Sequence, residues 1–431
     1  MKLAYNKTTL DNGLRVLTCA MPHTYSVGVG FYMSIGSRYE QPATAGGAHF
    51  IEHMLFKGTE RRPAPEAIAL EIEGHGGLFN ASTGQEMTVL WTKMQQVHLP
   101  LALDVLSDML RHSLLTADEV EKERRVILEE LSSSQDIPEE LVNLALHDLT
   151  WPGHPLGWDV AGTPESVRGL GRAELAQFLL SYYGPHNTVI SVAGDVAHDQ
   201  VVELAGALLG DWPRAAAPSF LAAPVDGAGP RIALINKKVE QTHLALHLPG
   251  LARDHADRFI LGLLNVILGE GMSSRLFLEI RERLGLAYAV DSYVSHLADT
   301  GVTGVYAAVA PDRALEALSA ILAQLQRLRV EPVDARTLHS AKEYVKGRML
   351  LGLEDTMAVS GWFGRQEALG GERLTVEQIM ERVAAIDAEE LMRVAQQLFQ
   401  AGQSRLAIVG PHKRRDEARF QALLANGPLA A

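Results

Sequence analysis

The feature that most constrains the fold of this 431-residue chain is that its two halves repeat one plan. Residues 171–196 predict an amphipathic helix, a turn and a strand that closes on Gly194. Residues 387–411 predict the same series of elements, closing on Gly410. Copies so far apart indicate paired domains, because the repeats of solenoids are only about 20–50 residues long.

A segment near the middle of the chain separates these halves. Residues 213–230, PRAAAPSFLAAPVDGAGP, are rich in Ala, Pro and Gly and predict a linker between domains 1–212 and 231–431. Each half opens with alternating strand residues, at 24–37 and 231–250, before helical periodicity and a final strand. We therefore expect an α+β fold of two homologous domains, each a mostly antiparallel β-sheet with helices packed on one face.

Composition narrows the classes of partner and of chemistry. The formal net charge of −13 argues against nucleic acid, whose binding requires clustered basic residues. The apolar runs are too short to cross a bilayer, so no membrane partner is expected. The first residues show no secretory pattern, which favours the cytoplasm. Cys19 is the only cysteine and excludes intrachain disulfides and multi-cysteine zinc sites.

The stretch GGAHFIEHMLFKGT, which begins at Gly46, carries the clearest chemical pattern. On a helix, His49 and His53 project about 40° apart, so both imidazoles can reach one ion. Glu52 lies about 60° to the other side of His49 and is placed to hold a water. This H-x-x-E-H order reverses the H-E-x-x-H zinc pattern. The alternative interpretation is two unrelated histidines on an amphipathic helix.

A catalytic zinc normally takes three protein ligands, so the pattern requires a further His, Asp or Glu elsewhere. The candidate region is 116–134, TADEVEKERRVILEELSSS, which predicts a helix with a capping box formed by Thr116 and Glu119. Four apolar positions predict its packed side: Val120, Val126, Ile127 and Leu131.

Carboxylates of this helix are the candidates for the third ligand. Glu123 and Glu130 are two turns apart and share a face within about 20°, so one can bind metal while the other supports it. Glu129 points about 100° away from Glu130, and geometry alone leaves both open. Periodicity alone also allows a solvated charged face without any metal.

The chain carries two segments that together resemble the metal signature of one family: HFIEHMLFKGT and ERRVILEE. The spacing is similar as well, with 76 residues between His53 and Glu130. That family is the pitrilysin and mitochondrial processing peptidase family of zinc metallopeptidases, the inverzincins, in its short two-domain type. The resemblance implies that His49, His53 and Glu130 bind one Zn²⁺ per chain. It further implies that Glu52 is the general base and that Glu123 supports the metal ligands from outside the coordination sphere.

The resemblance extends to segments that contact substrate. GGLFNASTGQEMTVLW is similar to the family's edge strand that pairs with a peptide, which places Asn80 and Ala81 at substrate-contacting positions. GEGMSSRLFLEIRERLGLAYAVDSY is similar to the family's segment with an Arg and a Tyr that bind the substrate near the scissile bond. Arg281 and Tyr288 match this pair. Guanidinium and phenol groups can bind a carbonyl and a developing oxyanion. On the residues alone, Asn80 is a turn residue, Arg281 a surface helix residue and Tyr288 a core residue.

The implied function is that of a zinc metalloendopeptidase that hydrolyses unfolded or extended peptides inside a chamber formed by a dimer. A homodimer is expected, and a heterodimer with a homologous subunit is the other form that the resemblance allows. The rival interpretation is a non-catalytic peptide-binding or scaffold subunit of a larger assembly.

Overall fold

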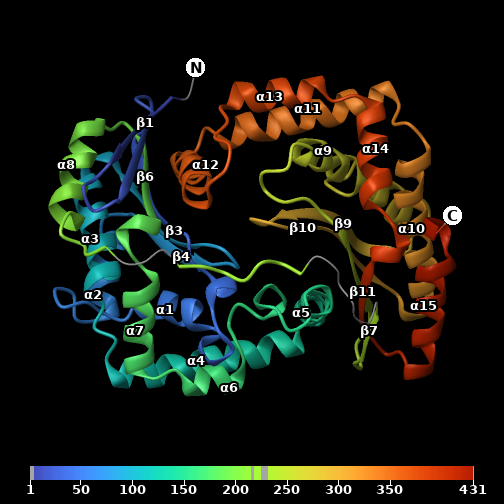
Figure 1. The fold of residues 1–431 in the computed structure, drawn as a ribbon, viewed down its shortest axis with the longest axis horizontal. Coiled ribbons are helices and arrows are strands. Elements are labelled where there is room, and N and C mark those ends of the chain that lie inside the picture. Colours follow the sequence, from blue (N-terminus) through green and yellow to red (C-terminus); the bar gives the residue numbers. More distant parts are fainter. Residues whose placement is uncertain (1–3, 215–217, 225–231, 431) are drawn as a thin grey trace. The chain divides into compact units, whose positions relative to one another are not determined.

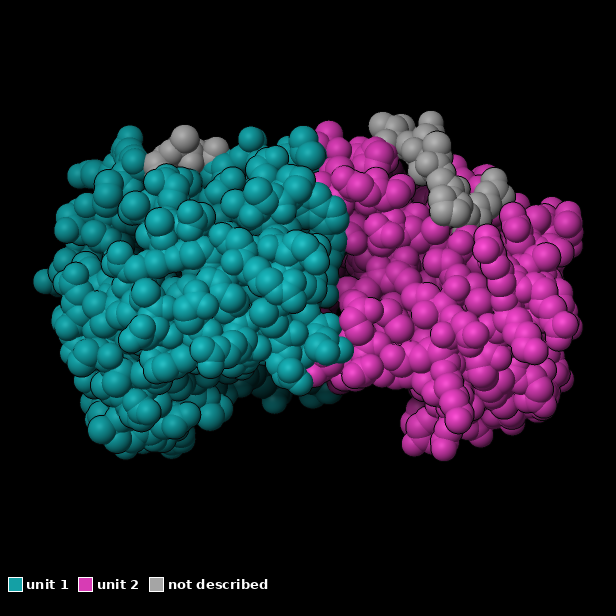
Figure 2. All heavy atoms as spheres, turned by 90° about the horizontal axis from the view of Figure 1, so that it is seen from below, with its two compact units in different colours: residues 1–132, 158–221, 350–373 teal, residues 133–157, 222–349, 374–431 magenta. Residues whose placement is uncertain are grey.

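The computed structural model of the protein describes residues 4–214, 218–224 and 232–430, and Figure 1 shows its fold. The chain forms two compact units, coloured separately in Figure 2. Unit 1 consists of Met1–Ser132, Trp158–Leu221 and Leu350–Arg373. Unit 2 consists of Ser133–Gly157, Ala222–Met349 and Leu374–Ala431. Each unit is therefore assembled from stretches of both halves of the chain.

Unit 1 is built on a six-stranded sheet with the order β1-β2-β6-β3-β5-β4. Only the pairing of β2 with β6 is parallel. The strands are β1 (Tyr5–Thr9), β2 (Arg15–Ala20), β3 (Ser26–Met33), β4 (Leu78–Thr83), β5 (Thr88–Gln95) and β6 (Thr188–Gly194). β4 is an edge strand, as expected from the resemblance of its sequence to the family's peptide-binding edge strand.

The helices of unit 1 gather mainly on one face of this sheet. In β3, alternate residues Val27, Val29 and Phe31 belong to the core on that face, whereas Tyr32 belongs to a second cluster on the opposite face. The helices are α1 (Gly47–Leu55), α2 (Pro65–Glu73), α3 (Leu99–His112), α4 (Ala117–Asp136), α6 (Pro164–Gly169), α7 (Arg172–Tyr182) and α8 (His198–Leu209), of which α4 ends in unit 2.

A helix from the second half of the chain covers the opposite face. This helix, α12 (Thr356–Leu369), packs on β3 and β6 (Figure 1). A Cβ atom at Gly28 of β3 would lie only 2.8 Å from the backbone of Thr356, so glycine allows this close approach. The buried carboxylate of Glu367 pairs with Lys7 and Arg15 on the sheet and ties the helix in place.

Unit 2 repeats the topology of unit 1. Its sheet has the order β7-β11-β8-β10-β9, and only the pairing of β7 with β11 is parallel. This order matches β2-β6-β3-β5-β4 strand for strand, which confirms the predicted duplication. The strands are β7 (Ile232–Asn236), β8 (Thr242–Pro249), β9 (Ala287–His296), β10 (Gly301–Val309) and β11 (Arg405–Gly410).

Helices again cover mainly one face of the second sheet. They are α9 (Arg258–Leu268), α10 (Ala314–Val330), α11 (Ala335–Gly352, whose last residues belong to unit 1), α13 (Val376–Ala385), α14 (Ala388–Leu398) and α15 (Glu417–Asn426). The other face is covered by α5 (Pro138–Thr150), a helix from the first half of the chain, through Leu141, Val142 and Leu146. α5 and α12 thus make a reciprocal exchange between the halves.

The predicted fold class is confirmed. The exchange of α5 and α12 between the two units is a further feature that the sequence did not predict. One cut at the linker does not reproduce the compact units, because 133–157 and 350–373 each belong to the unit built mainly from the other half. Within the expected linker 213–230, residues 213–214 and 218–224 form neither helix nor strand, and the rest lies outside the described residues. None of the described helices is long and apolar enough to cross a membrane.

Candidate active site

The predicted metal helix is α1, which presents its polar residues away from the core. Its apolar residues are fully buried against the unit 1 sheet and neighbouring helices: Phe50, Ile51, Met54 and Leu55. His49, Glu52 and His53 lie outside this buried set and are partly exposed. The helix begins after Gly46, which has a left-handed φ of 86°, and Phe56 is its C-cap. Amphipathic patterning therefore places the reactive side chains at the accessible side of α1.

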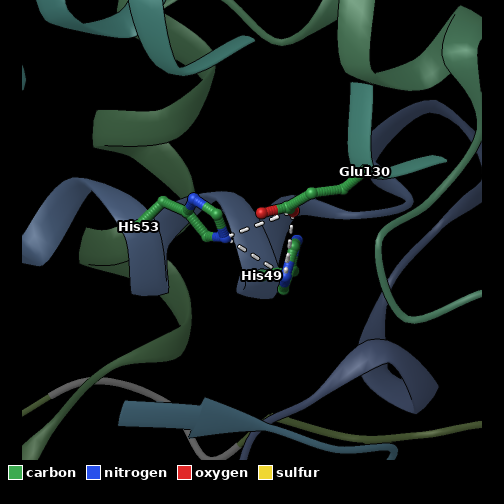
Figure 3. A group of neighbouring side chains, drawn as sticks. All are labelled: His49, His53 and Glu130. Atoms are coloured by element: carbon green, nitrogen blue, oxygen red, sulfur yellow. Dashed lines mark hydrogen bonds and ion pairs between the residues drawn. The ribbon is translucent and has the colours of Figure 1, made fainter. Parts of the chain in front are cut away.

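The two histidines of α1 and Glu130 of α4 converge on one point (Figure 3). The Nε2 atoms of His49 and His53 are 3.3 Å apart. The Oε2 atom of Glu130 lies 3.6 Å from Nε2 of His53 and 3.9 Å from Nε2 of His49. Within the described part of the chain, this is the one group of three or more such side chains close enough to share an ion.

The spacing and chemistry of these donors fit a zinc ion. Tetrahedral coordination with zinc–ligand distances of about 2.0–2.1 Å places donor atoms about 3.3 Å apart, close to the observed separations. Nδ1 of His53 lies 2.9 Å from Oε1 of Glu123. A proton on Nδ1, donated to this carboxylate, leaves Nε2 of His53 with the lone pair that a metal needs. Two imidazoles and one carboxylate are also a known catalytic zinc donor set.

Glu123 is itself held by a residue that the sequence analysis did not single out. The Nζ atom of Lys57 lies 2.7 Å from Oε2 of Glu123, whose side chain is almost fully buried. A buried carboxylate needs a partner, and the ammonium group supplies one while His53 takes the other oxygen. Lys57 lies four residues after His53, a spacing that could have pointed to the same side of the chain.

Burial also sets the protonation state of His49. Burial and, to a lesser extent, the nearby His53 together lower the pKa of this imidazole to about 4. Metals bind the neutral form of histidine, so the environment of His49 keeps it ready to bind near neutral pH.

Glu52 has the environment of a proton acceptor. Burial is the largest influence on its carboxyl group and raises its pKa, while the hydroxyl and amide of Thr83 on β4 act in the opposite direction. Its Oε2 atom is buried and has no hydrogen-bond partner among the described residues. A carboxylate with a raised pKa and a free oxygen is suited to accept a proton.

The structure separates the two neighbouring carboxylates of α4 that the sequence left open. Glu130 belongs to the metal-binding group, whereas Glu129 is exposed and does not. The expectation for Val126 is wrong, since this side chain is 44% exposed. Val126 lies about 40° around the helix from the half-exposed Glu130 and at least about 100° from the other three predicted packing residues, so it lies off the packed face.

The predicted peptide-binding residues lie on the edge strand β4. This strand pairs with β5, with Asn80 opposite Trp91 and Ala81 opposite Leu90. Asn80 is exposed, and its Oδ1 accepts the amide hydrogen of Ala81 at 2.8 Å. Ala81 is buried in the core, so its side chain cannot reach a bound peptide.

Arg281 and Tyr288 come together in unit 2. Arg281 lies in a π-helical segment, Phe277–Arg283, and Tyr288 lies at the beginning of β9. The guanidinium carbon of Arg281 is 5.4 Å from the ring centre of Tyr288 and 4.9 Å from that of Phe277. Tyr288 is 75% exposed, so its interpretation as a core residue is wrong. π-helical turns are rare and often occur at functional sites.

Comparisons with known proteins agree with this geometry. Residues 15–164 match "Insulinase (Peptidase family M16)", and residues 169–345 match "Peptidase M16 inactive domain". An uncharacterized zinc protease of Streptomyces coelicolor is 36% identical over 97% of this chain and 92% of its own length. The uncharacterized zinc protease YmxG of Bacillus subtilis is 34% identical over 94% of this chain and 97% of its own.

Solved structures show the same fold. A protease from Helicobacter pylori has a TM-score of 0.89 and 25% identity, covering 95% of this chain and all of its own. A chain of complex III₂ from Candida albicans has a TM-score of 0.81 and 19% identity, covering 97% of this chain and 99% of its own. At that identity the second likeness concerns the fold alone.

Proposed function

Because this chain belongs to peptidase family M16, the pitrilysin-like zinc proteases, we propose that it is a zinc-dependent endopeptidase. Its substrates are unfolded or extended peptides. The observation that carries the proposal is the convergence of His49, His53 and Glu130 at separations that suit one zinc ion.

Glu52 acts as the general base. His49, His53 and Glu130 would hold the zinc ion, which would supply Lewis acidity to acidify a water and to stabilise negative charge on a carbonyl oxygen. Glu52 takes the proton of the attacking water and then returns it to the leaving amine. Its raised pKa supports this role, as does its Oε2 atom, which has no hydrogen-bond partner among the described residues. Glu123 keeps His53 in the tautomer that presents Nε2 to the metal.

Substrate is held through its main chain. The edge strand β4 offers hydrogen-bonding groups to an extended peptide, which gives affinity with little demand on sequence. Asn80 contacts the peptide with its exposed side chain, whereas Ala81 contributes its backbone. Arg281 binds a substrate carbonyl, and the phenol of Tyr288 donates a hydrogen bond to the developing oxyanion.

The working form in this proposal is a dimer that encloses a chamber. Each chain has its own metal-binding group of His49, His53 and Glu130 and its own Arg281–Tyr288 pair. A homodimer would therefore contain every part of the site. A heterodimer with a homologous subunit is the second form. The cytoplasmic location expected from the sequence stays a prediction.

A non-catalytic scaffold or peptide-binding subunit is the rival function. The match of residues 169–345 to an inactive domain favours it. It predicts no zinc or no turnover, whereas the proposed enzyme requires both.

The deciding experiment measures zinc content and cleavage of an unstructured peptide, with and without a chelator. We expect cleavage that stops on chelation and returns with zinc. Glu52→Gln should retain zinc and fold but lose cleavage. Zinc-free protein without turnover would support a scaffold, and peptide binding without cleavage would support a binding subunit. Light scattering on the same sample gives the oligomeric state.

A further inference from the structure

The beginning of the metal helix has an unusual arrangement of its caps. The first amide groups of a helix have no partner within the helix and are normally capped by a side chain at the N-cap position. The N-cap of α1 is Gly46, which has no side chain to offer. A Cβ atom there would lie 2.4 Å from the carbonyl oxygen of Ala161. The usual capping residues Ser, Asp and Asn are therefore excluded from this position.

A carboxylate from outside the helix takes over this role. Oε2 of Glu40 accepts the amide hydrogen of Gly46 at 2.7 Å, and Oε1 accepts that of Ala48 at 2.8 Å. Glu40 is only 2% exposed. Burying a carboxylate is costly unless it is well hydrogen-bonded, and the positive end of the helix dipole favours it here.

The surrounding loop is also fixed. Oγ of Ser166 donates a hydrogen bond to the carbonyl oxygen of Ala45 at 2.7 Å. Gly162 approaches the same turn so closely that a Cβ atom would lie 2.4 Å from that oxygen. This loop thus fixes the residue before the N-cap, and Glu40 binds the amides of the N-cap and of the first turn.

We propose that Glu40 is a positioning residue that fixes the first turn of α1 and thereby holds His49 ready for the metal. His49 directly follows Ala48, whose amide Glu40 binds. Without the cap, the first turn can fray, and metal binding must then order His49 as well. The inference rests on the proposed zinc site and concerns a residue outside the metal-binding group.

The test compares Glu40→Gln with Glu367→Gln. Glu367 is a buried carboxylate of the same unit that pairs with Lys7 and Arg15 instead of α1. Burial raises the pKa of Glu40 to about 8, so zinc affinity is measured at a pH of about 8.5, where most of the wild-type group is ionised. The amide of Gln has one acceptor in place of two and no charge.

We expect Glu40→Gln to weaken zinc binding about tenfold, a typical loss when a supporting hydrogen bond to a metal site is removed. The visible spectrum of the cobalt-substituted variant should change as well. Glu367→Gln should lower the melting temperature but leave zinc affinity and the cobalt spectrum unchanged. Zinc affinity of Glu40→Gln within twofold of wild type, or an equal loss in both variants, would overturn the proposal.

Hydrogen exchange of the wild-type apo-protein decides the matter if Glu40→Gln does not fold. The amides of Gly46 and Ala48 should exchange slowly, although first-turn amides are usually unprotected. Fast exchange at both amides overturns the proposal. This measurement needs no metal, so it separates failure of the cap from failure of the zinc site. Wild-type protein that shows the protected amides but binds no zinc contradicts the proposed function and the positioning role together.

Discussion

Units 1 and 2 share a topology but differ in the chemistry placed on it. α1 packs on β4 and α7, and its counterpart α9 packs on β9 and α14. The sequence of α9, RFILGLLNVIL, contains neither His nor an acidic residue where α1 carries His49, Glu52 and His53. The duplicated scaffold thus accepts a mostly apolar helix without metal-binding side chains as readily as a metal-binding one.

The helices that follow show the same contrast. Counted from the first residue of each helix, Glu123 of α4 corresponds to Ala341 of α11, and both are 5% exposed. Glu130 corresponds to Arg348 in the same way. At this pair of positions, the buried carboxylate occurs in the unit where His53 and Lys57 pair with it. The site is therefore a network of polar groups added to one copy of a common fold.

The strongest test of this contrast is Glu52→Gln. We expect peptide cleavage to fall about 10²–10⁴-fold, because the base is lost while the Lewis acid stays. Zinc content should not change. Glu343→Gln on α11 is the matched control, since this exposed carboxylate lies on the counterpart of α4 and should leave cleavage intact. Turnover by Glu52→Gln at the wild-type rate would remove the proposed mechanism.

Zinc affinity separates two neighbouring carboxylates of α4. Glu130→Gln should weaken zinc binding more than about 100-fold, since it removes a donor and not merely a supporting group. Glu129→Gln changes an exposed side chain outside the metal group and should have no effect. Calorimetric titration with zinc measures both variants. An equal loss in the two would mean that general charge, and not coordination, attracts the metal.

The supporting carboxylate should matter less than the donors. Glu123→Gln keeps the size of the side chain but weakens the hydrogen bond that sets the tautomer of His53. We expect zinc affinity to fall about 10–100-fold in the same titration. If the Glu123→Gln variant binds zinc as tightly as the wild-type protein, the buried pair of His53 and Glu123 serves the fold alone.

The smallest effect is expected at Lys57. Lys57→Met removes the ammonium group that pairs with Glu123 but keeps an unbranched side chain. Since it acts on the metal through two other residues, zinc affinity should fall less than about tenfold. The double variant Lys57→Met/Glu123→Gln should bind zinc as tightly as the single variant Glu123→Gln, because both changes interrupt one chain of contacts. Additive losses would place Lys57 in a separate role.

The local sequence pattern predicted those parts of the site whose residues lie within one or two turns of the same helix. The spacing of His49 and His53 predicted a shared ion because helix geometry alone brings them together. Periodicity could not choose between Glu129 and Glu130, and the family resemblance was needed to favour Glu130. The contacts of Glu40 with the α1 amides depend on a loop fold that carries no periodic signal.

The same limit applies to the fold. Alternating strands and helical periodicity predicted two similar units, and the sheet orders confirm this. The pattern of α5 indicates an apolar face but not which sheet that face covers. The buried side of α12 includes Ser360, Gly364 and Glu367, so the sequence of this helix shows no apolar face at all. Val126 is the opposite case, since this apolar residue lies beside the half-exposed Glu130 on the helix and is itself exposed.

The most direct measurement is an anomalous difference map at the zinc edge from crystals of the zinc-loaded protein. One peak per chain in contact with His49, His53 and Glu130, and none in unit 2, is the predicted result. A peak at another set of side chains, or no peak at this site when zinc is in excess, would contradict the central claim.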